Sequence, residues 1–186
     1  MISHSQGGPD TQWALQFWPS TNAVTTSFIP LSPDFAGIQF LDSNLSSLCQ
    51  GNSLCQASLW QQSAGSHFLG ALHSHGFTSK VPTTSIWSES DGVVTPPQQN
   101  AQLPAATVIS VQQLCPLRYV NHVYMPTDAA AFAIAMDALR HGGTADLSRV
   151  QTNSWTACFM IEAPNMSSTI AIQLQDDLNS LIDGFL

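Results

Sequence analysis

The chain has 186 residues, of which 44% are hydrophobic, and none of its apolar runs approaches the roughly twenty residues of a membrane-spanning helix. Its 4 Lys and Arg against 12 Asp and Glu give a formal net charge of −8, so it lacks the cationic surface that binds phosphate backbones. These values predict one globular domain over residues 1–186, with no transmembrane segment and no nucleic-acid partner.

The composition also indicates where such a protein works. Only 9% of the residues are charged, and Gln, Ser, Thr, Asn and Pro are abundant, which favours an extracellular protein. Asn44 and Asn165 each begin an Asn-x-Ser sequon that a secreted protein could have glycosylated. Residues 1–3 contain neither a basic region nor an apolar stretch, so we expect no signal peptide in this chain and secretion of a longer parent protein.

The first half of the chain is predicted to alternate between strands and helices. Residues 1–5 form the end of a strand that runs into a helix, with Pro9 in the first turn of this helix and Pro19 at its end. The β-branched and apolar stretch 24–31 predicts a buried strand. Residues 32–58, rich in Ser, Asn, Gly and Pro, predict a long loop with short helical pieces.

The second half continues this alternation. Strands are predicted at 81–87 and 105–111, and helices at 60–72, 129–140 and 168–186. Thr127 or Asp128 can cap the helix that starts at residue 129. Strands separated by helices predict an α/β protein with a largely parallel sheet.

One short motif points to nucleophilic chemistry. Residues 3–7, Ser-His-Ser-Gln-Gly, are close to the G-x-S-x-G nucleophile elbow, with Ser3 in place of the first Gly. In that elbow the serine lies on a strained turn between a strand and a helix, so small neighbours such as Ser3 and Gly7 are needed. The predicted strand and helix on either side of Ser5 are the context that the motif requires.

A serine hydroxyl needs a base, and the base needs an orienting carboxylate. Asp91 follows a predicted strand and precedes Gly92, while His122 lies in a loop after the next strand. The order Ser5, Asp91, His122 is the order of α/β-hydrolases, and all three follow the carboxyl ends of strands, where open α/β folds place their sites. An ordinary helix-initiating turn, a turn-forming Asp and a surface His are the alternative readings of these three residues.

Metal binding is not expected. His67, His73 and His75 have no acidic or Cys partner at ligand spacing. The four cysteines lack CxxC spacing and permit two disulfides: Cys49, Cys55, Cys115 and Cys158.

Several ordered blocks of sequence together resemble the family of fungal lipases typified by lipase B of Candida antarctica, which have the α/β-hydrolase fold. These blocks are residues 5–8 with Gln12-Trp13, 32–34, 60–62, 81–84, 90–91 with Val94 and Pro96, and 115–117 leading to His122. The resemblance implies hydrolysis of carboxylic esters, including triacylglycerols, through an acyl-enzyme and without metal or cofactor. The expected partner is an ester or lipid substrate, including one at a lipid–water interface.

The resemblance also implies individual roles. Ser5, Asp91 and His122 would form the catalytic triad, with the backbone N–H of Gln6 as an oxyanion donor. Asp34 and Gln62 would line the acyl side of the cleft, Val93 and Val94 would form apolar wall, and Cys115 would pair with Cys158. His4 stands where the family has Trp, so the pocket for the alcohol group should differ here. A local Cys49–Cys55 disulfide is expected in a region without a family counterpart.

Two alternatives stay open at this point. The family has strands and helices before the elbow, and a last segment with its own disulfide, that we do not find in this sequence, so the fold is expected to be partial and to start at the elbow. A truncated remnant that keeps the triad but does not catalyse would fit that pattern. A related hydrolase acting on esters of secondary metabolism would fit the change at His4.

Overall fold

A parallel four-stranded sheet forms the centre of the protein in the computed structural model, which describes residues 1–39, 41, 56–74 and 76–183. The strands are β1 (Ile2–His4), β2 (Ile29–Leu31), β3 (Thr84–Trp87) and β4 (Thr107–Ser110), and they lie side by side in this order. The register pairs Ile2 with Ile29 and Thr84 with Thr107. The prediction of an α/β protein with a largely parallel sheet is therefore confirmed.

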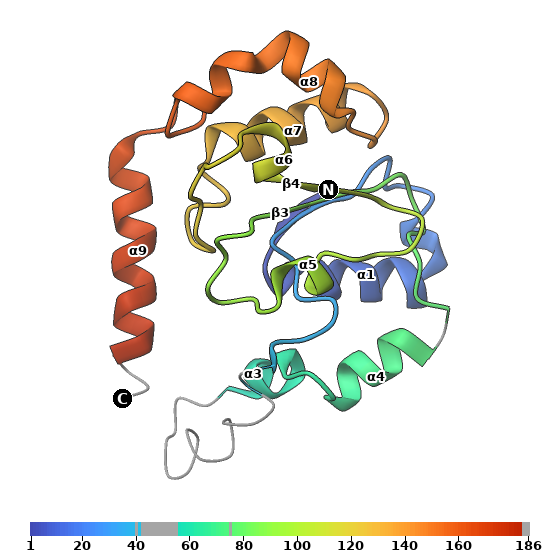
Figure 1. Cartoon of the computed structure of the whole chain (residues 1–186). Helices are drawn as coiled ribbons and strands as arrows, with labels where there is room; N and C mark the ends of the chain where they lie inside the picture. The colour runs from blue at the N-terminus through green and yellow to red at the C-terminus, as the bar shows by residue number, and fades with distance from the viewer. Residues whose placement is uncertain (40, 42–55, 75, 184–186) are drawn as a thin grey trace.

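Helices cover both faces of this sheet (Figure 1). Helix α1 (Gly7–Phe17) contacts β1 and β2 from one side, and α7 (Ala129–Arg140) contacts β2 and β3 from the other. Phe28 and Ile29 belong to different apolar clusters, one with Leu15 of α1 and one with Ile134 of α7. Adjacent residues of a strand point to opposite faces, so the two clusters are the two halves of the core.

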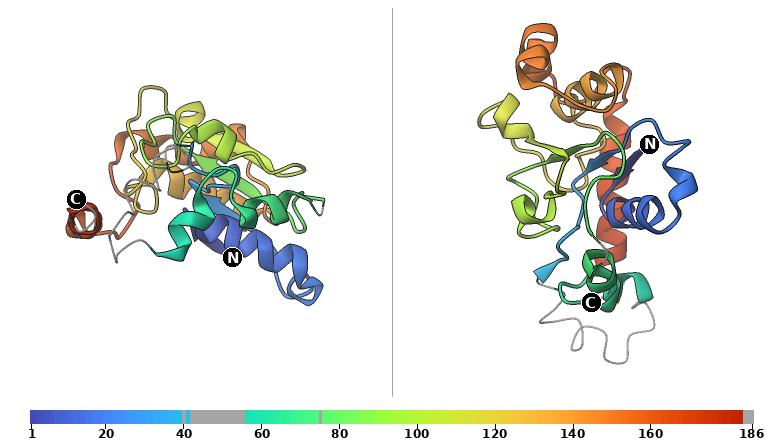
Figure 2. Two further views of the ribbon diagram at one scale, coloured as in Figure 1. Left: turned by 90° about the horizontal axis from the view of Figure 1, so that it is seen from below. Right: turned by 90° about the vertical axis from the view of Figure 1, so that its right-hand side faces the viewer.

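The other helices are shorter or lie farther from the sheet. They are η1 (Pro19–Thr21), α3 (Ala57–Gln62), α4 (His67–Ser74), α5 (Pro97–Asn100), α6 (Val111–Leu114), α8 (Leu147–Ser154), η2 (Trp155–Phe159) and α9 (Ser168–Asp183). Helix α4 contacts α1, and α8 contacts α7. Helix α9 stands beside the rest of the molecule, as the views of Figures 1 and 2 agree. Among the described residues no helix is both long and apolar enough to cross a membrane.

The strands predicted at 81–87 and 105–111 are shorter than expected, and two other predicted elements differ more. The strand expected at 24–31 is reduced to β2, and Val24 is 82% exposed, so its β-branched side chain does not contribute to a strand. The helix expected at 60–72 is two helices, because residues 63–66 form a turn in which Gly65 has a positive φ of 78° and Ser63 bridges to Ile38. By contrast, α7 has the predicted bounds, and Asp128 caps it by accepting from the N–H groups of Ala130 and Ala131.

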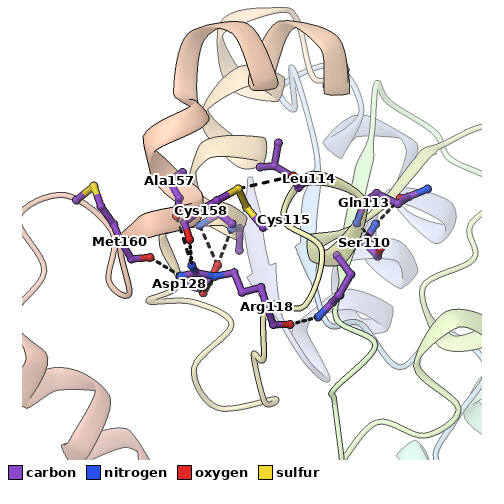
Figure 3. The surroundings of a disulfide bond; sticks show 12 residues. Ser110, Gln113, Leu114, Cys115, Arg118, Asp128, Ala157, Cys158 and Met160 are labelled. Atoms are coloured by element: carbon purple, nitrogen blue, oxygen red, sulfur yellow. Dashed lines mark hydrogen bonds and ion pairs between the residues drawn. A yellow bond between two sulfur atoms is a disulfide. The ribbon is translucent and has the colours of Figure 1, made fainter.

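A disulfide joins Cys115, after α6, to Cys158 in η2, with Cα atoms 5.4 Å apart. Figure 3 shows the guanidinium of Arg118 beside it. Arg118 forms an ion pair with Asp128 at 2.7 Å and donates to the carbonyl oxygens of Met160 and Ile161 at 2.6 and 2.9 Å. This group of contacts, here called the Arg118 clamp, fixes both ends of the segment between residues 118 and 128 and ties them to the chain that follows η2. Cys49 and Cys55 lie outside the described residues.

Candidate active site

The connection between β1 and α1 has the geometry of a strained elbow. Ser5 has a φ of 55°, which places this non-glycine residue in the left-handed region. Its N–H donates to the carbonyl of Leu31, and its own carbonyl accepts from Gly8, at 3.0 and 2.8 Å. A Cβ on Gly7 would lie 3.2 Å from the Cβ of Ser3, and one on Gly8 would lie 2.6 Å from the ring of Pro33. Small residues are therefore required here, as the elbow motif predicts.

Three side chains that are far apart in sequence meet at this elbow. The Nε2 atom of His122 lies 2.9 Å from the Oγ of Ser5, and its Nδ1 atom lies 2.7 Å from Oδ2 of Asp91. His122 and Asp91 are buried, with exposed fractions of 6% and 5%. Ser5 follows β1, Asp91 follows β3, and His122 follows β4 and the short helix α6. The carboxyl ends of parallel strands lie at one edge of the sheet, so the three residues start from the same edge.

Asp91 is held in its charged form. Burial acts to raise the pKa of its carboxyl group, but the hydrogen bond and charge of His122, with two backbone N–H groups, outweigh burial and hold the pKa below its usual range. The two N–H groups belong to Val93 and Val94, and both lie 2.9 Å from Oδ1. The family resemblance implies that the side chains of these valines form an apolar wall. The Val94 side chain is fully buried and that of Val93 is 39% exposed, and the backbone of both residues orients Asp91.

The backbone N–H of Gln6 is available to a ligand. Among the described residues it makes no hydrogen bond, and it stands at the N-terminal end of α1, where unpaired N–H groups and the helix dipole favour negative charge. The side chain of Gln6 accepts from Nε2 of Gln62 at 3.2 Å. Gln62 therefore lies beside the elbow, and its place on the acyl side of a cleft stays a prediction.

His4 lies against His122. Its Nε2 atom donates to the main-chain carbonyl of His122 at 2.9 Å, and the two ring centroids are 4.6 Å apart. Burial, followed by the charge of His122, lowers the pKa of His4 to about 4. Its ring is therefore neutral at ordinary pH. The family resemblance implies that His4 belongs to the pocket for the alcohol group, and no residue pattern indicates its contact with His122.

Asp34 is the least satisfied polar group near the site. Its side chain is fully buried, and neither carboxyl oxygen accepts a hydrogen bond from another described residue. Burial raises the pKa of Asp34 to about 7, and its own backbone N–H and the charge of His122 offset only part of this effect. Near neutral pH this carboxyl group therefore exists in both protonation states.

This burial predicts a pH-dependent stability. Between about pH 4 and pH 7 the unfolded chain ionises Asp34 while the folded protein keeps it protonated, so the free energy of unfolding falls as the pH rises and levels off above pH 7. The loss is on the order of a few kcal/mol, since each pH unit of difference contributes about 1.4 kcal/mol. Asp34→Asn should remove this loss, so its stability relative to the natural protein should increase between pH 4 and pH 8.

Urea unfolding at several pH values measures this difference. Asp176→Asn, which removes the same charge from an exposed position of α9, serves as the control and should not reproduce the trend. A constant difference between Asp34→Asn and the natural protein from pH 4 to pH 8 would contradict the prediction.

The described histidines do not assemble a metal site. No group of three or more His, Cys, Asp or Glu side chains with metal-binding geometry occurs among the described residues. His73 instead bonds through Nε2 to the carbonyl of Phe35 at 2.8 Å, and His67 is exposed. His75 lies outside the described residues.

Comparison with known proteins finds relatives that are similar in sequence and in fold. No protein-family model matches the chain. Lipase B of Pseudozyma antarctica is 31% identical over 147 residues, which cover 75% of this chain and 42% of that protein. The crystal structure of Aspergillus fumigatus lipase B superimposes with a TM-score of 0.79 at 32% identity, covering 99% of this chain and 46% of that one. The chain thus spans less than half the length of these relatives. In sequence and in fold it belongs to the family of these fungal lipases, and its sheet with flanking helices is part of an α/β-hydrolase fold.

Proposed function

We propose that the protein is a serine hydrolase that cleaves carboxylic esters through an acyl-enzyme, with Ser5 as nucleophile, His122 as base and Asp91 as the carboxylate that orients the base. The observation that carries this proposal is the continuous chain of hydrogen bonds from Ser5 Oγ through His122 to Asp91, at 2.9 and 2.7 Å. The strained φ of Ser5 supports it as well, because strain of this kind is common at nucleophile elbows.

The first half of the reaction transfers the acyl group. Ser5 Oγ attacks the ester carbonyl carbon while its proton passes to His122 Nε2, and the imidazolium keeps its Nδ1–H directed at Asp91. The N–H of Gln6 donates to the carbonyl oxygen as it becomes negative. When the carbon–oxygen bond to the alcohol breaks, His122 returns the proton to the leaving oxygen, which leaves the acyl group on Ser5.

The second half releases the acid. A water molecule gives a proton to His122 Nε2 and attacks the acyl carbon, and the proton then passes to Ser5 Oγ as the acyl–serine bond breaks. No redox step or bound cofactor is required, since each proton taken up by His122 is given back within the same half-reaction.

We assign the substrate to the lipid esters, including triacylglycerols at a lipid–water interface. The resemblance to two lipases supports this assignment, as does the partly exposed apolar side chain of Val93 beside Asp91. We also propose that the protein acts outside the cell, because the Cys115–Cys158 disulfide is stable in oxidising compartments.

The proposal is tested by hydrolysis together with covalent labelling. The purified protein should hydrolyse p-nitrophenyl butyrate and a tributyrin emulsion. A fluorophosphonate should inactivate it with one equivalent, as the Ser5 Oγ–phosphorus bond forms and fluoride leaves. Peptide mass spectrometry should find the adduct on Ser5. A folded protein that hydrolyses no ester and takes up no fluorophosphonate would be the non-catalytic alternative, and an adduct on another serine would reject the assignment of Ser5.

A further inference from the structure

His4 makes two contacts with the residue that the proposed mechanism uses as base. The first is the hydrogen bond from its Nε2 to the carbonyl oxygen of His122 at 2.9 Å. The second is the contact between the two rings, whose centroids lie 4.6 Å apart and whose planes are inclined by 35°. One side chain therefore restrains both the backbone and the imidazole of His122.

The tautomer of His4 follows from these contacts. A carbonyl oxygen only accepts hydrogen bonds, so Nε2 of His4 must carry the proton that it donates. Burial and the nearby charge of His122 keep the ring neutral above about pH 4. A neutral ring can lie against His122 while that residue is an imidazolium, whereas a second cation there would repel it.

The surroundings of His4 contain few other charges. The titratable groups whose charge acts on it are His122 and Asp91, the latter favouring its protonation. The cavity beside it has a volume of about 280 Å³. It is otherwise lined mainly by apolar side chains, among them Ile2, Leu31, Met125 and Phe132. Among the described residues, His122 is the one to which His4 is joined by both a hydrogen bond and a ring contact.

The position of His4 in the chain links its contacts with His122 to the position of Ser5. It is the last residue of β1 and directly precedes Ser5, so the nucleophile and the support of the base belong to one short segment. If that segment shifted, Ser5 and His4 would move together, and the bond from His4 to the His122 carbonyl would carry His122 along with Ser5. This coupling matters because a misplacement of about 1 Å can cost on the order of a hundredfold in rate.

We propose that His4 is a positioning residue, which holds His122 in register with Ser5 through the bond to its main-chain carbonyl and the packing of the two rings. The proposal rests on the proposed function of Ser5 and His122. The proposed role of His4 affects kcat per active site. This role does not depend on which alcohol group the substrate carries.

Three substitutions separate the two contacts. His4→Ala removes both, His4→Phe keeps a ring but no donor, and His4→Gln keeps a donor but no ring. Rates are measured with p-nitrophenyl butyrate and divided by the number of sites that a fluorophosphonate titrates, so that misfolded protein does not count. Phe132→Leu, in the same cavity but without a hydrogen bond to His122, is the matched control.

We expect His4→Ala to lower kcat per titrated site by about a hundredfold with KM changed less than about threefold. His4→Gln should recover part of that loss, and Phe132→Leu should behave like the natural protein. A purely structural role would reduce the number of titrated sites and leave kcat per site unchanged, which would overturn the proposal. A natural protein that neither turns over nor titrates would instead reject the proposed function itself.

Discussion

Replacing Ser5 by Ala is expected to lower kcat for p-nitrophenyl butyrate by at least about four orders of magnitude, and by about six if the site behaves like other serine hydrolases. The substitution removes the Oγ atom that lies 2.9 Å from His122 Nε2 and that forms the acyl-enzyme in the proposed mechanism. His122 could then activate only water, without the covalent intermediate that divides the reaction into two easier steps.

A matched control is needed because Ala at a φ of 55° is itself strained. Ser20→Ala changes an exposed serine in η1 in the same way and should keep full activity. Circular dichroism and urea unfolding should show that Ser5→Ala is folded. Activity of a folded Ser5→Ala within tenfold of the natural protein would show that another group performs the attack.

Asp91→Asn is expected to lower kcat by about four orders of magnitude while the fold is retained. The reason lies in the asymmetry of the carboxyl group. Oδ1 accepts two backbone N–H groups, so the amide oxygen of the variant must take that place and its NH₂ must face His122. An NH₂ group donates to Nδ1, so the proton of the neutral ring must lie on Nε2. A protonated Nε2 cannot accept the proton of Ser5.

Steady-state kinetics with a short-chain ester measure this effect, with Glu89→Gln as the control. Glu89 is exposed and lies in the same turn, so its substitution removes an equal charge without touching His122. If the two variants lose activity equally, a general change of charge rather than the tautomer of His122 is responsible.

The sequence predicts the members of the candidate site better than their mutual contacts. Ser5, Asp91 and His122 each follow a strand, and in a parallel sheet this rule alone brings them to one edge. Their catalytic roles stay a prediction. The N–H groups of Val93 and Val94 that hold Asp91, and the carbonyl of His122 that holds His4, belong to the backbone. A residue pattern does not reveal such contacts, because every residue carries the same backbone groups.

Some helices of the fold can likewise be predicted from the sequence, and others cannot. The periodic apolar pattern and the Asp128 cap together predict α7 with its observed bounds. Helix α8 was not predicted, because Val150 is its only buried residue among those described and it has no apolar stripe. The sequence feature that indicates the start of α8 is Asp146, whose side chain caps the helix by accepting from the N–H of Arg149. Short helices of this kind depend on tertiary contacts more than on their own sequence.

The Arg118 clamp makes the segment that carries His122 a closed ring. The ion pair between Arg118 and Asp128 joins its two ends, so the entropy of closing this ring is lost once, when the chain folds. In the proposed mechanism, His122 would then need no further ordering when a substrate binds, and the remaining entropic cost of each turnover would be that of ordering the substrate. Substitution of the exposed Tyr119, which lies in this ring, is therefore expected to leave His122 in place.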